Sequence, residues 1–138
     1  MITAKRHRQH IVIETPRGQF VKYNEAGKVD FYSPIPSPFN YGHLQGLMGG
    51  DGDPLDGLLL GPSVSRGLVI EAEVIGVVRF LDKGEVDDKW ILSISGDISQ
   101  RQKYMIRLFF HFYAQMKKLL AFRLISGKIS RVIRIEYF

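Results

Sequence analysis

The chain has 138 residues, of which 45% are hydrophobic and 24% are charged. This composition is close to the globular average, and we expect one domain over residues 1–138. The absence of cysteine from the sequence excludes disulfides and thiolate metal sites, which leaves oxygen and imidazole as metal ligands. No apolar run has the length of a membrane span or a secretory signal, so we expect a cytoplasmic protein.

The charges are unevenly distributed along the chain. Nineteen Lys and Arg against 14 Asp and Glu give a formal charge of +5, which favours anionic partners. Basic residues concentrate in residues 1–10 and between Arg101 and Arg134, whereas the carboxylates cluster between Asp51 and Asp88. We expect residues 1–10 to form a solvated basic arm.

The first half of the chain predicts two short strands and a long loop. Residues 11–14 and 20–23 are typical of strands that flank a turn at residues 15–18. Residues 33–54 are rich in proline and glycine, which remove backbone donors and favour turns. We therefore expect residues 33–54 to be a long functional loop.

The next segment predicts further strands. Residues 55–60 are apolar enough for a buried strand, and residues 69–80 alternate in a way that favours a half-exposed strand with a bulge at Gly76. Another strand is expected over residues 89–94, after an acidic turn at residues 82–88.

The last part of the chain predicts a helix over about residues 99–123 and a final strand over residues 129–135. The apolar positions that recur at helical spacing, and are expected to face the core, are Met105, Leu108, Phe109, Phe112, Met116, Leu119 and Leu120. Many short strands followed by one amphipathic helix indicate an α+β fold that is mainly β, a small β-barrel with a helix packed on it near the C-terminus.

Three carboxylates, Asp51, Asp53 and Asp56, lie within six residues. Folding brings their charges together, and a bound cation offsets that repulsion. A solvated acidic turn is the simpler interpretation, but Pro54 and Leu55 stiffen the cluster. An EF-hand is excluded because its sixth position, which requires glycine, is Asp56. We predict a divalent-metal loop, with Mg²⁺ as the ion.

A second acidic group consists of Asp82, Asp87 and Asp88 and is followed directly by Lys89. Taken alone, such a turn is most often a solvated hairpin tip. Two acidic groups beside strands of one small barrel favour a shared centre that holds more than one metal ion.

Motifs in four segments together resemble a known family, the soluble Mg²⁺-dependent inorganic pyrophosphatases of the single-domain, family I type. They run from about residue 11 to residue 118 in the family's order. The matching segments are Ile13 to Gly18 with Lys22-Tyr23, Asn40-Tyr41-Gly42 with Asp51 to Asp56, Asp82 with Gly84 to Lys89, and Phe109 to Tyr113. The resemblance implies a five-stranded OB-like barrel with a flanking helix.

The resemblance also implies roles for individual residues. It implies that Asp53 is the general base and that Glu14 is an outer carboxylate of the metal network. The implied metal ligands are Asp51, Asp56, Asp82 and Asp87, and the implied phosphate contacts are Lys22, Tyr41, Lys89 and Tyr113. The implied cofactor is Mg²⁺, with Mn²⁺ as an alternative, and family members of this size usually form homo-oligomers.

Four positions depart from the family pattern. Asn24 replaces a glutamate, Val29 a phosphate-binding arginine, Ser37 a tyrosine and Ala114 a lysine. The predicted metal ligands are all present, so these departures affect phosphate binding. Among nearby lysines that could compensate, Lys28 is expected to point to the opposite face of its strand, which leaves Lys117 and Lys118.

Three functional hypotheses follow. The leading one is hydrolysis of pyrophosphate to two phosphates by a metal-activated water, with reduced activity possible because of the four departures. The second is a homologue that binds metal and phosphate with impaired catalysis. The third is a nucleic-acid-binding OB-like barrel, which the acidic residues in the middle of the chain disfavour because they repel a phosphate backbone.

Overall fold

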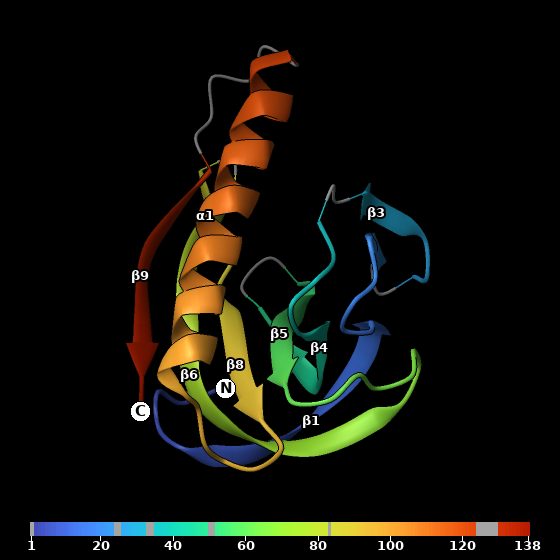
Figure 1. Ribbon diagram of the computed structural model, residues 1–138, viewed down its shortest axis with the longest axis vertical. Coiled ribbons are helices and arrows are strands. Elements are labelled where there is room, and N and C mark those ends of the chain that lie inside the picture. The colour runs from blue at the N-terminus through green and yellow to red at the C-terminus, as the bar shows by residue number, and fades with distance from the viewer. Residues whose placement is uncertain (1, 24–25, 33–34, 50–51, 83, 124–129) are drawn as a thin grey trace.

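The computed structural model describes residues 2–23, 26–32, 35–49, 52–82, 84–123 and 130–138. In chain order, its elements are β1 (His7–Thr15), β2 (Val21–Tyr23), β3 (Val29–Tyr32), β4 (Asn40–Met48), β5 (Pro54–Leu60), β6 (Val69–Asp82), β7 (Glu85–Val86), β8 (Lys89–Ser93), α1 (Gln100–Arg123) and β9 (Arg131–Tyr137). Figure 1 shows α1 crossing one side of the sheet, with the β2–β3 hairpin away from it.

Five strands close into a barrel, as the family resemblance implied. Strand β1 pairs with β4, β4 with β5, β5 with β8 and β8 with β6, and β6 returns to pair with β1. The β5–β8 pair is parallel, while the other pairs around the barrel are antiparallel. Because the last strand pairs with the first, the barrel has no free edge.

Strand β6 is long enough to pair with two strands, one after the other, along the same edge. Its first part pairs with β1, and from Gly76 to Leu81 it pairs with β9. The pairing with β8 shifts register between Val74 and Gly76, which confirms the predicted bulge. A side chain at position 76 would press against the carbonyl oxygen of Glu136. The last strand therefore adds to β6 outside the barrel, and Ile129, included in its prediction, lies outside the described residues.

Strand β1 begins earlier than the predicted strand over residues 11–14. Residues 7–10 pair with residues 71–74 of β6, so this part of the predicted basic arm is a paired strand rather than a solvated tail. The alternation of exposed and half-exposed side chains over residues 7–10 explains why hydrophobic content did not reveal the strand.

The prediction of a long loop over residues 33–54 was wrong because β4 occupies residues 40–48. The glycines that suggested turns have a different use within the barrel. A Cβ atom at Gly42 would overlap the backbone carbonyl of Val12, so only glycine permits the close approach of β4 to β1. Gly42 also lies directly opposite Gly57 of β5.

Helix α1 starts with a capping box. The Ser99 hydroxyl accepts a hydrogen bond from the Gln102 amide at 3.1 Å, and the Gln102 side chain accepts one from the Ser99 amide at 2.9 Å. These bonds satisfy amides that the first helical turn leaves without partners, and they account for a helix start at Gln100. No described helix is both long and apolar enough to cross a bilayer.

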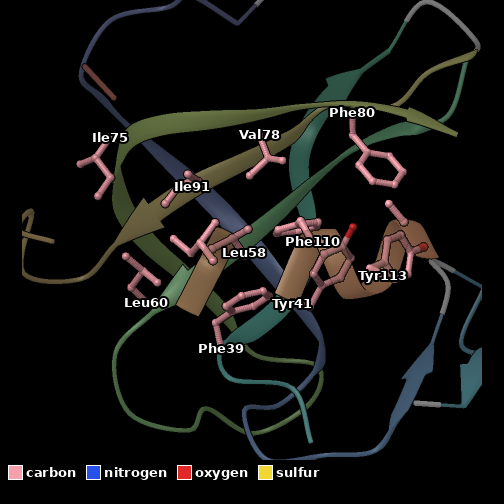
Figure 2. Packing of buried hydrophobic residues seen from close by; sticks show 12 residues of the cluster. Phe39, Tyr41, Leu58, Leu60, Ile75, Val78, Phe80, Ile91, Phe110 and Tyr113 are labelled. Carbon is pink, nitrogen blue, oxygen red and sulfur yellow. The ribbon is translucent and has the colours of Figure 1, made fainter. Parts of the chain in front are cut away.

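The predicted helix face was partly wrong. The buried residues are Ile106, Phe110, Tyr113 and Ala114, which pack against β4, β5, β6 and β8, as Figure 2 shows for the aromatic side chains. Of the predicted stripe, Phe109 packs against this cluster, but Met105, Leu108 and Leu119 are exposed by 41%, 47% and 55%. The helix is apolar around more than half of its circumference, so spacing alone allows either face.

Two buried clusters occupy opposite faces of the barrel wall. One fills the barrel, because all five of its strands contribute to it, with Trp90 and Leu92 from β8. The other lies between the wall and α1 and includes Ile91 from β8. Because side chains alternate along a strand, Lys89 shares the α1 side of β8 with Ile91.

Candidate active site

Lys89 occupies the centre of the candidate site. It is the first residue of β8 and lies opposite Asp56 in the parallel β5–β8 pairing. Its ammonium donates hydrogen bonds to Oδ2 of Asp56 at 2.6 Å and to Oδ2 of Asp87 at 2.7 Å. The side chain is 1% exposed, so a full positive charge is buried against two carboxylates. Charge-assisted bonds of this kind fix the geometry of all three groups.

Two tyrosines surround this charge. The Lys89 ammonium lies 5.8 Å from the ring centroid of Tyr41, and Figure 2 places Tyr41 and Tyr113 at the same end of the cluster under α1. Burial, followed by the negative charge of Asp56, raises the pKa of Tyr41 well above its usual value, so its phenol stays protonated. A protonated phenol can donate a hydrogen bond to an anionic ligand.

Lys89 keeps its charge despite its burial. Burial favours the neutral amine, but the negative charges of Asp56 and Asp87 outweigh it, and the pKa of Lys89 is raised well above its usual value. The site therefore retains a permanent cation at its centre.

Helix α1 brings a second lysine to the acidic residues. Oδ2 of Asp82, at the end of β6, lies 3.4 Å from the Lys117 ammonium, and Oδ1 accepts a hydrogen bond from the Ser130 hydroxyl at 3.2 Å. Lys117 also lies 5.4 Å from the ring centroid of Tyr113. Of the lysines considered from sequence as compensating groups, Lys117 is thus placed beside a predicted metal ligand and a predicted phosphate contact.

Glu14 has a neighbour that sequence reasoning did not select. It is a buried residue of β1, and its Oε2 lies 3.4 Å from Nδ1 of His43 on β4. His43 in turn lies opposite Asp56 in the β4–β5 register. No local pattern in the sequence indicates this pair, because the cross-strand register determines which residues meet.

Other predicted residues are only partly described. Asp53 is exposed in the turn before β5, and its backbone carbonyl accepts a hydrogen bond from Gly49 at 2.7 Å. Asp51 lies outside the described residues, as does the side chain of Lys22. Within the described ranges, no group of three carboxylate or imidazole side chains is arranged to hold a metal ion. The predicted ligand set, which includes Asp51, therefore stays a prediction.

The donors that are described suit a hard divalent cation. Asp56 and Asp87 approach the same ammonium from β5 and from the segment between β7 and β8, so their oxygens converge on one point. Oxygen ligands that converge in this way match the chemistry of Mg²⁺.

Three of the four positions that depart from the family pattern lie among the described residues, and the structure shows what surrounds each of them. The Ser37 hydroxyl donates a hydrogen bond to the Phe39 carbonyl at 2.6 Å, so it serves the backbone. Ala114 is packed in the cluster under α1, and Val29 is exposed on β3. Asn24 lies outside the described residues.

Sequence comparisons show which known proteins the chain resembles. The family model described as inorganic pyrophosphatase matches residues 11–127. The chain is 32% identical to the inorganic pyrophosphatase of Corynebacterium glutamicum, over 78% of this chain and 80% of that protein. It is 40% identical to a soluble inorganic pyrophosphatase of rice, over 65% of this chain but only 46% of that protein.

Solved structures show the same fold. The inorganic pyrophosphatase of Thermus thermophilus is similar with a TM-score of 0.76 and 30% identity, over 94% of this chain and 82% of that one. The inorganic pyrophosphatase of Helicobacter pylori is similar with a TM-score of 0.75 and 25% identity, over 99% and 88% of the two chains. The five-stranded barrel, the helix packed on it and the family match agree, and the chain therefore belongs to the inorganic pyrophosphatase family and is an enzyme of the hydrolase class.

Proposed function

We propose that the chain hydrolyses inorganic pyrophosphate to two phosphates at the site around Lys89, with Mg²⁺ as its cofactor. The observation that carries this proposal is the convergence of Asp56 and Asp87 on the buried ammonium of Lys89, beside Tyr41. Carboxylates that can bind a divalent cation and a fixed cation that can bind phosphate are thus adjacent. The family match supports the same reaction.

Asp56 and Asp87, with Asp51 and Asp82, are the proposed metal ligands, and Glu14 supports them from β1. When bound, Mg²⁺ supplies positive charge that offsets the charge of the diphosphate and lowers the pKa of water. Mn²⁺ offers the same chemistry with oxygen ligands.

The side chains have separate tasks in the reaction. Lys89, Lys22, Tyr41 and Tyr113 bind phosphate oxygens and hold the substrate in one orientation. Asp53 accepts the proton of the attacking water as the water oxygen bonds to phosphorus. The bond from that phosphorus to the bridging oxygen then breaks, and the second phosphate leaves with that oxygen.

The experiment is to measure phosphate release from pyrophosphate in the presence of Mg²⁺, for the wild type and for Asp53→Ala. We expect turnover by the wild type and a loss of about 100-fold or more in the variant, the scale for general-base catalysis. Glu71→Gln, which removes an exposed carboxylate on β6, should retain wild-type turnover and serves as the control. Wild-type turnover that does not exceed that of Asp53→Ala would reject the proposal.

One observation favours the second candidate, a family member that binds metal and phosphate without turnover. The Ser37 hydroxyl is committed to a backbone carbonyl, and Ala114 is packed in the core, so neither position supplies a phosphate contact. Mg²⁺ binding that persists without phosphate release would select this candidate.

A homo-oligomer in the cytoplasm is part of the same proposal. Its support is an exposed apolar face of α1 that includes Tyr104, Met105, Leu108 and Leu119. Such a face is stabilised when it is covered by another copy. Light scattering should give a mass above one chain, and Leu108→Glu should lower that mass; a wild-type monomer would reject the oligomer.

A further inference from the structure

Arg79 joins three elements from the side of the wall that faces away from α1. It lies on β6, and its Nη1 donates a hydrogen bond to Oδ2 of Asp88 at 2.8 Å. Its Nε donates to Oε2 of Glu136 on β9 at 2.9 Å. The guanidinium also lies 5.5 Å from the ring centroid of Trp90 on β8. A planar guanidinium suits this arrangement because its donors point in fixed directions.

The partner of Arg79 on the β7–β8 segment lies between two residues of the candidate site. Asp88 separates Asp87 from Lys89, and both of those residues belong to the ion pairs at the centre of the site. Since neighbouring side chains of an extended segment point to opposite faces, Asp88 can be held from the far side without blocking the site.

The backbone of this segment is tied to β6 at the same place. The Asp87 amide donates a hydrogen bond to the Phe80 carbonyl at 2.9 Å, and the Phe80 amide donates to Oδ1 of Asp88 at 3.3 Å. Asp88 is thus bound through both of its oxygens, one to the β6 backbone and one to Arg79. These bonds fix the orientation of the segment between β7 and β8 about its own chain direction.

We propose that Arg79 is a positioning residue that acts through Asp88 to aim Asp87 and Lys89 into the site. The proposal rests on the function proposed above, which makes Asp87 a metal ligand. Glu136 orients the guanidinium from β9, so the last strand of the chain contributes to the site although it lies outside the barrel. Residues that hold metal ligands in this indirect way have measurable effects on metal affinity.

The test is calorimetric titration with Mg²⁺ alone, for the wild type, Arg79→Gln and Asp88→Asn. We expect both variants to bind Mg²⁺ about tenfold more weakly, the lower end of the range for second-layer partners of metal ligands. Arg79→Lys should recover part of the affinity, because one ammonium can keep the charge but not both directed bonds. Trp90 is the chain's single tryptophan, so its fluorescence reports locally on the same titration.

Arg8→Gln is the matched control. Arg8 forms an exposed ion pair with Glu71 on the first part of β6, and its loss should leave Mg²⁺ affinity unchanged. A purely structural role for Arg79 predicts a lower unfolding midpoint with wild-type Mg²⁺ affinity, and that result would overturn the inference. Asp88→Asn preserves the shape of the side chain, so it decides the question if Arg79→Gln does not fold.

The titration also separates this inference from the proposed function. Absence of phosphate release by the wild type would reject the hydrolytic function, whereas calorimetry still measures whether Arg79 controls Mg²⁺ affinity. A wild type that binds no Mg²⁺ would overturn the inference itself.

Discussion

The carboxylate half and the phosphate half of the candidate site are built in different ways. Asp56 and Lys89 lie on strands β5 and β8, which pair with each other inside the closed barrel. Lys22 lies on β2, which pairs with β3 in a separate two-stranded sheet, while Tyr113 and Lys117 come from α1. Asp56, Lys89 and Tyr41 are therefore part of the barrel wall, whereas the other proposed phosphate contacts come from elements placed against it.

The difference explains where the family pattern is kept and where it changes. A ligand on a barrel strand is fixed by hydrogen bonds on both sides, so its position depends on the whole barrel. A contact supplied by a helix can be replaced from the next turn, since residues three or four apart share a face. Ala114 and Lys117 are three residues apart, which is consistent with such a replacement.

The largest expected effect is a loss of stability caused by forcing apart β1 and β4, two strands of the barrel that carries Asp56 and Lys89. Gly42→Ala places a methyl group on the carbonyl of Val12, which cannot move without separating β1 from β4. We expect a loss of about 3 kcal/mol in the free energy of unfolding, the upper part of the range for overpacking. Urea denaturation measures it.

Gly57→Ala is the control for this variant. Gly57 faces Gly42 across β4 and β5, but its added methyl group would meet only the ends of the Ile11, Leu44 and Leu92 side chains. Those side chains can adjust, so we expect a cost of about 1 kcal/mol. Equal losses in the free energy of unfolding for the two variants would show that the clash with the carbonyl of Val12 is not what destabilises Gly42→Ala.

The next effect comes from removing the cation that links the two halves. Lys89→Met should lower kcat by about 100-fold, the scale for losing one preorganised donor to a developing charge. Mg²⁺ affinity should not fall, because Asp56 and Asp87 keep their charges and lose a competing cation. Steady-state kinetics at several Mg²⁺ concentrations separates the two quantities, and an unchanged kcat would contradict the role of Lys89.

The smallest effect is expected for the helix lysine. Lys117→Ala should lower kcat/KM for pyrophosphate by about tenfold, as expected for one hydrogen bond to a charged group. Lys103→Ala is the matched control, because Lys103 is also on α1 and lies over a tyrosine ring, that of Tyr137 on β9, outside the candidate site. Equal kinetics for the two variants would remove Lys117 from the phosphate half.

The acidic motifs and most of the strands were predictable from the sequence because each is a local pattern, whereas the five-stranded barrel was implied by the family resemblance. Alternating residues such as those around Ile70 give the strands, and closely spaced carboxylates such as Asp53 and Asp56 give the metal prediction. The bulge at Gly76 was also read from the sequence. These features depend on neighbours along the chain rather than on the final packing.

What sequence reasoning missed depends on register and close packing. Gly42 lies in the segment that predicts a loop, yet in the structure it allows two strands to approach closely. The buried face of α1 was misassigned because Ile106 and Leu108 both fit an apolar spacing. His43 beside Glu14, and Arg79 bound to Asp88 and Glu136, meet only after the strands have paired.

Asp87→Asn tests the central claim most directly, because it asks whether one carboxylate serves both Mg²⁺ binding and turnover. Calorimetry and phosphate release should be measured on the same preparation, with the exposed Asp97→Asn as the control. We predict that Mg²⁺ affinity and the rate of pyrophosphate hydrolysis both fall, each by at least about tenfold. Wild-type Mg²⁺ affinity and wild-type turnover in Asp87→Asn would contradict the assignment of the site around Lys89.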